Sequence, residues 1–219
     1  MRNILPDDPE RKGALRDKYD AYAPRYDWVL GGLEWLGVRR LRRELLAGAR
    51  GQVLEVAVGT GRNLEHYPPG CNLQAVDLSP GMIRFARRRA ERLGLAVGFR
   101  LMDAERLDFP DGSFDTVVST LSTCTFPDPV AAMREMGRVA RPDGRILLLE
   151  QGFSDRPWLR RWQAGRVEKQ FQWLGCRWDR EPDQQARQAG LLVERQRRTC
   201  LGALHLLTLR PGPAPGGGG

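Results

Sequence analysis

A short apolar run that ends in a glycine turn, residues 53–61, constrains this chain more than any other feature. The run reads VLEVAVGTG, and Asp77 closes the next apolar segment sixteen residues after Gly61. Gly59 and Gly61 let the backbone turn where a side chain would collide with a ligand. An open parallel sheet binds an adenosine-bearing cofactor with this order of elements: a strand, a glycine turn, a helix, a second strand and an acid. The acid accepts hydrogen bonds from the ribose hydroxyls.

The spacing of the turn residues narrows the choice of cofactor. Dinucleotide sites need a third glycine so that a pyrophosphate can sit at the helix N-terminus, and that position is Leu64 here. Glu55 precedes the turn, and a carboxylate there would repel a pyrophosphate but suits a cationic amine or sulfonium. The pattern resembles motif I of the class I S-adenosylmethionine-dependent methyltransferases, with Ala57 in place of the first glycine. The alternative is an incidental glycine turn in another α/β protein.

The length and composition of the chain are those of a single-domain globular protein. The 219 residues are enough for one domain with a full core, and 41% hydrophobic with 28% charged residues is typical of a soluble globular chain. No run reaches the roughly 18 apolar residues of a membrane span, and the N-terminal residues lack the apolar core of a signal peptide. A cytoplasmic location is therefore expected, with peripheral contact at a membrane left open.

The net charge of +8 comes almost entirely from arginine. It indicates either an anionic partner, such as an acidic lipid surface, or charge spread over solvated helix faces. No nucleic-acid-binding motif accompanies the charge, so nucleic acid is not expected as a partner. No metal site is expected either, because the cysteines are too widely spaced for zinc: Cys71, Cys124, Cys176 and Cys200.

The chain divides into a helical entry segment and one α/β domain. Residues 1–50 are expected to form an N-terminal helical cap or lid, with breaks at Pro24 and at the following glycine pair. Residues 51–210 alternate strands and helices, and 153–180 form an aromatic and basic insertion expected to cover the substrate. Residues 211–219 are a Pro/Gly tail, disordered by composition.

Periodicity and turn residues predict seven strands and four helices in the α/β domain. The strands are expected at 53–58, 73–77, 97–102, 114–119, 145–149, 191–198 and 203–209, and the helices at 61–67, 81–93, 130–140 and 182–189. This order fits the Rossmann-like, seven-stranded methyltransferase sheet, with its last strand antiparallel and helices on both faces. Its ligand crevice lies at the carboxyl ends of the strands.

Four further segments resemble the same family in the same order: 76–82, 102–105, 109–115 and 138–144. The resemblance implies that Asp77 binds the ribose, that Asp103 accepts the adenine amino group, and that S-adenosyl-L-methionine is the cofactor. The residues expected to contact this cofactor are Tyr19, Tyr26, Glu55, Ala57, Gly59, Gly61, Asp77, Leu78, Met82, Asp103, Ala104 and Ser119. A lone acid at a strand end can also be a helix cap, and only the joint spacing of the acids favours the cofactor.

Residues 19–27, read as YDAYAPRYD, resemble the corresponding segment of quinone C-methyltransferases and phospholipid N-methyltransferases. In those relatives aromatic rings close over the methionine moiety, and a sulfonium against an aromatic face is favourable by roughly 0.5–2 kcal/mol. The alternative is that Tyr19, Tyr22 and Tyr26 only pack the helix on the core.

The acceptor is expected to be a small, lipophilic molecule. Residues 119–125 and 148–151 most resemble animal methyltransferase-like proteins that methylate thiols, so a thiol acceptor is favoured. Phospholipid N-methylation and quinone C-methylation are the alternatives within enzymes. Outside them, the chain could be a cofactor-binding scaffold without turnover.

Methyl transfer is an in-line displacement on an activated carbon, so it needs alignment and exclusion of water rather than a catalytic triad. The catalytic residues are therefore not assigned from the sequence. Cys124 and Thr123 follow the fourth strand and Glu150 ends the fifth, which makes them weak candidates; a buried capping role suits Glu150 equally well. His205, in the last strand, is expected to be a packed residue.

Overall fold

The computed structural model describes residues 9–213, apart from the side chains of residues 30, 33, 35 and 36. Residues 1–8 and most of the expected tail, 214–219, lie outside the described part. The strands are β1 (Gln52–Val56), β2 (Asn72–Asp77), β3 (Val97–Leu101), β4 (Phe114–Thr120), β5 (Ala140–Gln151), β6 (Leu191–Thr199) and β7 (Leu204–Pro211). The α-helices are α1 (Pro9–Leu33), α2 (Arg39–Leu46), α3 (Pro80–Leu93), α4 (Pro129–Val139), α5 (Pro157–Ala164), α6 (Val167–Leu174) and α7 (Pro182–Gln188).

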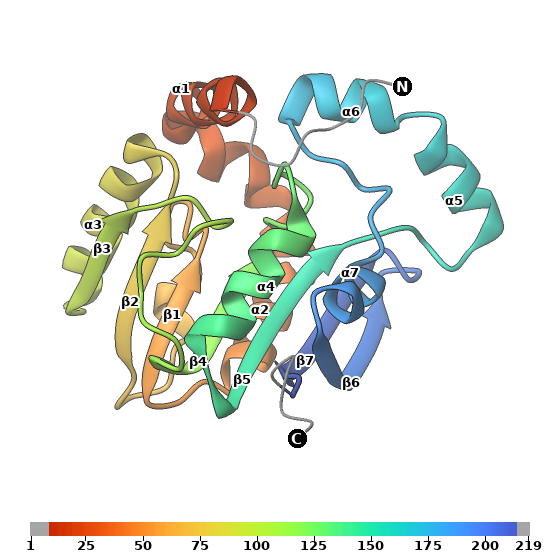
Figure 1. Ribbon diagram of the computed structural model, residues 1–219. Helices are drawn as coiled ribbons and strands as arrows, with labels where there is room; N and C mark the ends of the chain where they lie inside the picture. The colour runs from red at the N-terminus through yellow and green to blue at the C-terminus, as the bar shows by residue number, and fades with distance from the viewer. Residues whose placement is uncertain (1–8, 214–219) are drawn as a thin grey trace.

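The strands form one seven-stranded sheet in the order β3-β2-β1-β4-β5-β7-β6 (Figure 1). Strands β1 to β5 run parallel, and β7 pairs antiparallel with both β5 and β6. This is the predicted Rossmann-like architecture, with its last strand antiparallel. The five parallel strands bring their carboxyl ends to one edge of the sheet, below α1.

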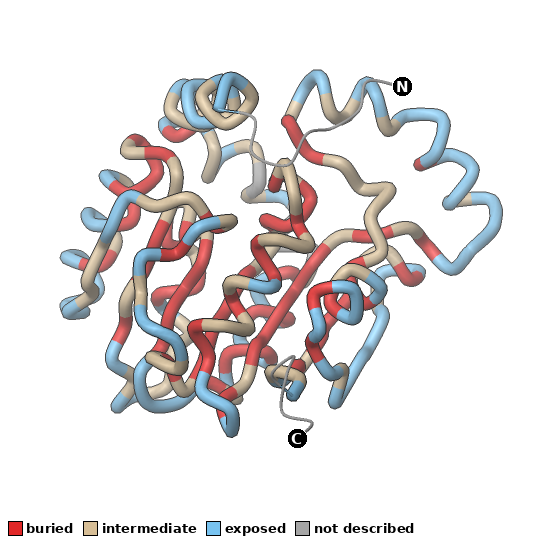
Figure 2. The backbone as a smooth tube through the Cα atoms, viewed as in Figure 1, coloured by how far each residue is buried: buried red, intermediate tan, exposed pale blue. Residues whose placement is uncertain are grey.

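The central strands are covered on both faces (Figure 2). Val117 and Leu148 pack with α4 and α7, whereas their neighbours Val118 and Leu149 point to the other face, toward α2 and α3. Because successive residues of a strand alternate between faces, a continuous apolar run such as β5 can only be satisfied by helices on both sides.

The helices that follow β2 and β4 begin where the sequence predicts. The Ser79 side chain accepts a hydrogen bond from the Met82 N–H, and Asp128 accepts from the N–H groups of Val130 and Ala131. Both caps are followed by proline in the first turn, where a missing N–H costs nothing. Each helix therefore starts at a fixed distance from the site edge of the sheet.

The helical segment before the sheet differs from its prediction. Helix α1 continues through Pro24 and the glycine pair, and the chain breaks instead at Gly37, whose φ is 124°, within the π-helical segment Glu34–Val38. A helix tolerates the roughly 3 kcal/mol of an internal proline when tertiary contacts hold it. Asp20 and Asp27, on either side of Pro24, both bond to the α/β domain.

Two further segments depart from expectation. The helix expected at 61–67 is reduced to one 3₁₀ turn, Leu64–His66, because the glycine turn takes up its start and a proline pair follows. The 153–180 insertion forms α5 and α6, which stand away from the sheet, with α6 next to α1 and α5 farther out (Figure 1). Strand β7 continues to Pro211, one residue into the expected tail.

Candidate active site

A cleft of about 90 Å³ lies at the carboxyl ends of β1, β2 and β4, roofed by α1. It brings together residues that are far apart in the sequence and that were predicted to bind a cofactor. Nine of the twelve predicted residues line it: Tyr19, Tyr26, Ala57, Gly59, Asp77, Leu78, Met82, Asp103 and Ala104. Glu55, Gly61 and Ser119 do not line it.

The glycine turn has the backbone that its sequence requires. Gly59 has a φ of 56°, and a Cβ at this position would meet no atom within 4 Å, so its open side faces the cleft. Gly61 instead allows close packing between the turn and its neighbours, because a Cβ there would lie 2.8 Å from Leu64 and 3.2 Å from Ala86 of α3. Ala57 has a φ of 56°, in the left-handed region that favours glycine, so the residue that replaces the first motif glycine is strained.

Asp77 ends β2 at the centre of the cleft. Its carboxylate accepts hydrogen bonds from the N–H groups of Gly59 (2.8 Å) and Ser79 (2.9 Å). Burial raises the pKa of Asp77 to about 6, and the backbone donors oppose that shift. The carboxylate is therefore held rigidly as an acceptor at the floor of the cleft, as a ligand hydroxyl would require.

Lys12, which the sequence analysis did not single out, lies at the Asp103 end of the cleft. Its Nζ is 2.7 Å from Asp103 Oδ2 and 2.9 Å from Glu105 Oε2, and the Asp103 Oδ1 accepts the Glu105 N–H. The first turn of α1 is thus tied to the loop after β3. Sequence could not find this contact, because nothing local marks one surface lysine among others.

The two acids of the YDAYAPRYD segment fasten α1 to the domain. Asp20 accepts hydrogen bonds from the Gly81 N–H (2.6 Å) and from the Ser79 hydroxyl, at the start of α3. Asp27 accepts from the Thr60 hydroxyl (2.6 Å) in the glycine turn and pairs with Arg89 of α3. These bonds explain the two aspartates of the motif, for which the sequence analysis had no role.

Two of the three tyrosines of the same segment, Tyr19 and Tyr26, face the cleft, whereas Tyr22 lines a neighbouring cavity. The rings of Tyr19 and Tyr26 meet edge to face with centroids 6.4 Å apart, and both line the cavity. The Tyr19 hydroxyl donates to the Leu174 carbonyl at 3.1 Å, which joins α1 to the end of α6. Burial raises the pKa of the Tyr26 hydroxyl, which therefore stays protonated at neutral pH.

Glu55 lies beneath the glycine turn rather than in the cleft. It is buried, and its two carboxylate oxygens accept from Asn63 Nδ2 and the Tyr67 hydroxyl, each at 2.9 Å. Burial raises its pKa to about 7. Glu55 therefore does not line the cleft, and its predicted contact with a cofactor stays a prediction.

Arg42 is a buried cation that the sequence analysis missed. From α2 it donates to Glu34 Oε1 (3.0 Å), to Asn63 Oδ1 (2.9 Å) and to the Thr120 hydroxyl, and Thr120 lines the cleft. Asn63 in turn donates to Glu55. One hydrogen-bonded network therefore supports the glycine turn and the end of β4 from below.

A second, larger cavity of about 460 Å³ adjoins the cleft. Four residues line both spaces: Tyr19, Tyr26, Leu121 and Thr125. The rest of its wall is largely apolar and comes from α1 and the 153–180 insertion, including Leu159, Trp162, Trp173, Leu174 and Trp178. We call this space the acceptor-side cavity.

The weak catalytic candidates lie on the loop after β4 and behind it. Glu150 is fully buried and accepts the N–H groups of Ser122 (3.0 Å) and Thr123 (3.1 Å), which is the capping role. Cys124 lines the acceptor-side cavity, and its hydrogen bond with Cys176 and its burial raise the pKa of the thiol. Ser119 is buried and bonds to Ser122. These groups shape the loop, and none presents a free carboxylate or thiolate.

Comparison with known proteins agrees with this geometry. Residues 54–148 match the family model described as a methyltransferase domain. The chain is 37% identical over 139 residues to a demethylmenaquinone methyltransferase of Thermus thermophilus, which covers 60% of this chain and 63% of that protein. It is 36% identical over 133 residues to a phosphatidylethanolamine N-methyltransferase of Cereibacter sphaeroides, covering 60% of this chain and 65% of the relative. The matches thus span slightly less than two thirds of these relatives.

A solved structure of an S-adenosylmethionine-dependent methyltransferase from Thermotoga maritima superposes with a TM-score of 0.68 at 20% identity, over 90% of this chain and 99% of that one. At that identity the likeness concerns the fold. Residues 54–148 thus form a methyltransferase domain, and the seven-stranded sheet has the fold of the class I S-adenosylmethionine-dependent methyltransferases.

Proposed function

We propose that this protein binds S-adenosylmethionine in the cleft and transfers its methyl group to a lipophilic acceptor of the quinol class in the acceptor-side cavity. The observation that carries the proposal is the wall shared by the two spaces, formed by Tyr19, Tyr26, Leu121 and Thr125. A methyl group at that wall can be approached from the opposite side by an acceptor, as in-line displacement requires.

In this arrangement Asp77 receives the ribose hydroxyls, Asp103 and Ala104 hold the adenine, and the tyrosine rings cover the methionine end. The open side of Gly59 and the orientation of Asp77 suit a nucleoside ligand. The cleft is smaller than the roughly 300 Å³ at which small-molecule sites begin, but it adjoins the larger acceptor-side cavity, and an outward movement of α1 would give a cofactor more room.

The lining of the acceptor-side cavity favours a lipophilic acceptor. Its aromatic and aliphatic wall would exclude water from the reacting atoms, and the raised pKa values of Tyr26 and Cys124 leave it without a free anion from these two groups. The relatives named above act on a quinone and a phospholipid, and neither is named for thiols. We therefore place a quinol ahead of the thiol that the sequence favoured.

A lipophilic acceptor resides in a membrane, and the rim of the acceptor-side cavity suits contact with one. Trp158, Trp162 and Trp173 are 59%, 45% and 63% exposed on α5 and α6, among arginines. Aromatic rings beside basic side chains bind the interface of anionic bilayers. Within the described residues no helix combines the length and the apolarity needed to cross a bilayer. The proposed contact is thus peripheral.

Transfer of a labelled methyl group from S-adenosylmethionine tests the proposal. The acceptors are a short-chain demethylmenaquinol, phosphatidylethanolamine and an alkyl thiol, each with neutral or anionic vesicles. We expect label in the quinol and a faster reaction with anionic vesicles. Label only in the lipid amine or the thiol would reassign the acceptor, and cofactor binding without label in any acceptor would favour the scaffold.

The variant Asp77→Asn provides the control for the cofactor site. Replacing a charged acceptor of hydrogen bonds costs about 1.5–3 kcal/mol, or roughly 10- to 150-fold in the dissociation constant. An unchanged affinity in calorimetry would show that the ribose does not bind at Asp77. Asp108→Asn, an exposed acid outside the cleft, is the matched variant that should keep full affinity.

A further inference from the structure

His205 is the most unusual buried polar side chain outside the cleft. It is fully buried on β7, and neither ring nitrogen makes a hydrogen bond of good geometry among the described residues, although backbone groups of Gly202 and Phe153 lie close enough to act on its pKa. Buried polar groups are nearly always paired, so an imidazole with two orphaned nitrogens needs an explanation. The sequence predicts a packed or edge residue here, and packing accounts for the burial but not for the missing partners.

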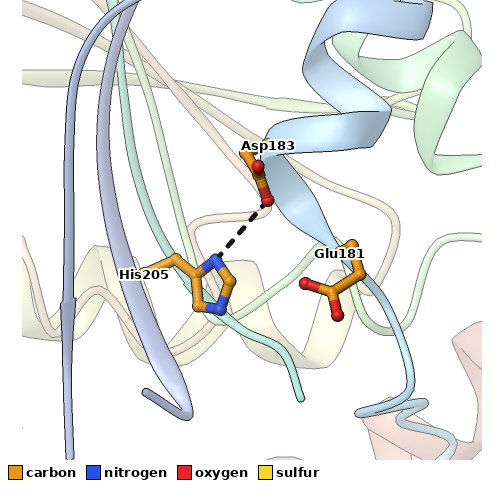
Figure 3. A group of neighbouring side chains, drawn as sticks. All are labelled: Glu181, Asp183 and His205. Carbon is orange, nitrogen blue, oxygen red and sulfur yellow. Dashed lines mark ion pairs between the residues drawn. The ribbon is translucent and has the colours of Figure 1, made fainter. Parts of the chain in front are cut away.

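Two carboxylates from the start of α7 face this imidazole (Figure 3). Asp183 Oδ1 is 3.9 Å from His205 Nδ1, and one donor atom of Glu181, Asp183 and His205 each lies within 4.8 Å of the others. The acids are also largely shielded, with side chains 15% and 11% exposed. Figure 3 shows the edge of the ring turned toward both acids.

This donor set matches a divalent metal. One imidazole and two carboxylates are ligands for zinc and other first-row ions, with bonds of about 2.0–2.2 Å. Two donors on one such ion are roughly 3–4 Å apart, so the separation between Asp183 and His205 already falls in range. Glu181 needs a movement of about 1 Å to complete the set, which a change of its side-chain torsions supplies.

Arginines compete for the same oxygens. Arg198 Nη2 is 3.4 Å from both Glu181 Oε2 and Asp183 Oδ1, the latter being the oxygen that faces His205. Arg187 binds the other oxygen of Asp183 at 3.0 Å, and Arg160 is 3.4 Å from Glu181 Oε1. The Arg198 contacts are long and its side chain is 30% exposed, so it can swing into solvent while Arg187 remains as an outer partner.

We propose that Glu181, Asp183 and His205 form a binding site for a divalent first-row metal ion, in competition with Arg198. The ion would join β7 to the start of α7 at the edge of the acceptor-side cavity. Gly152 connects the two places, since it lines that cavity and a Cβ on it would lie 2.7 Å from His205 Nε2. The metal would therefore stabilise the wall of the cavity, and it does not depend on the proposed methyl transfer.

Titration of the full chain with Co²⁺ tests the site, with uptake measured by equilibrium dialysis and elemental analysis. We expect one equivalent, visible d–d absorption without the thiolate charge-transfer band that binding to a cysteine would give, and a higher melting temperature with the ion. Arg198→Gln should tighten binding about tenfold or more, because it removes a cation from the coordinating oxygens. His205→Asn should weaken it at least tenfold, since a ligand is lost.

Two further variants separate loss of the metal site from unfolding and from a general effect of removing an acid. Asp183→Asn replaces His205→Asn if circular dichroism shows the latter unfolded, and Asp179→Asn, an acid paired with Arg177 nearby, should bind as the unaltered chain does. No uptake by the unaltered chain at about 1 mM Co²⁺ overturns the proposal, even if Arg198→Gln binds. Equal uptake by the folded Asp183 or His205 variant overturns it too.

Discussion

The buried Glu55 makes the stability of this protein depend on pH in a predictable direction. Its pKa is about 7 in the folded chain, because burial disfavours the charged form, whereas the unfolded chain keeps the ordinary value of 4.5 for a solvated carboxyl group. Between these values the folded protein holds a proton that the unfolded chain has released. The free energy of unfolding from this group therefore falls as pH rises from 4.5 to 7 and stays low above it.

The size of the effect follows from the two pKa values. Each pKa unit is worth about 1.4 kcal/mol, so the difference between 4.5 and about 7 corresponds to about 3 kcal/mol. The variant Glu55→Gln keeps the shape and cannot ionise. Its amide accepts from only one of Asn63 and Tyr67, a loss of about 1 kcal/mol. We expect the variant to be about as stable as the unaltered chain at about pH 5, where the unfolded chain has already released most of this proton, and more stable by about 2 kcal/mol at about pH 8.

Urea unfolding at four pH values between about 5 and 8, followed by circular dichroism, measures this difference. Glu150, whose pKa is also raised, contributes equally to both proteins and cancels, whereas Asp77 cancels only in part because its charge acts on Glu55. The exposed Glu91→Gln on α3 is the matched control, and its curve should run parallel to that of the unaltered chain. If the Glu55→Gln curve also ran parallel, Glu55 would be ionised in the folded state and the reasoning from burial would fail.

Three other variants test the support of the site. Ala57→Gly should raise the free energy of unfolding by about 0.5–1 kcal/mol by relieving the left-handed backbone; a decrease in the urea midpoint would contradict this. Arg42→Met should cost about 3–5 kcal/mol, because Glu34 stays buried with only the long contact to Arg62, and a loss under about 1 kcal/mol would show the network to be dispensable. Asp27→Asn should speed amide hydrogen exchange in α1 while leaving the sheet protected, since it weakens the pairing with Arg89. Unchanged exchange in α1 would show that other contacts hold this helix on the domain.

Sequence reasoning predicted what local chemistry determines. The caps at Ser79 and Asp128, the apolar strands and the glycine turn each depend on residues a few positions apart, and they are found where expected, except that β5 begins at Ala140, five residues before its predicted start. The cleft residues at the strand ends followed from these elements, because parallel strands bring their carboxyl ends to one edge. The position of the Glu55 side chain did not follow, since an acid beside a ligand turn and an acid beneath it have the same sequence pattern.

What the sequence could not supply are contacts made across long separations. Lys12 meets Asp103, and Arg42 meets Thr120, with no local pattern that marks either basic residue among the many in this chain. Pro24 is a case in which long-range contacts make a local prediction wrong. A proline inside a helical segment predicts a break in the helix. The hydrogen bonds that Asp20 and Asp27 accept from the α/β domain keep the helix continuous here.

Helix α1 takes part in several of these long-range contacts, and they link the two cavities. It lines both the cleft and the acceptor-side cavity, it is fastened to the glycine turn and α3 by Asp20 and Asp27, and Tyr19 joins it to the end of α6. A movement of α1 that widens the cleft therefore either displaces α6 as well or breaks the Tyr19 hydroxyl bond that links the two helices. The size of one space is thus coupled to the size of the other through a single helix, and the coupling needs no contact between the two ligands.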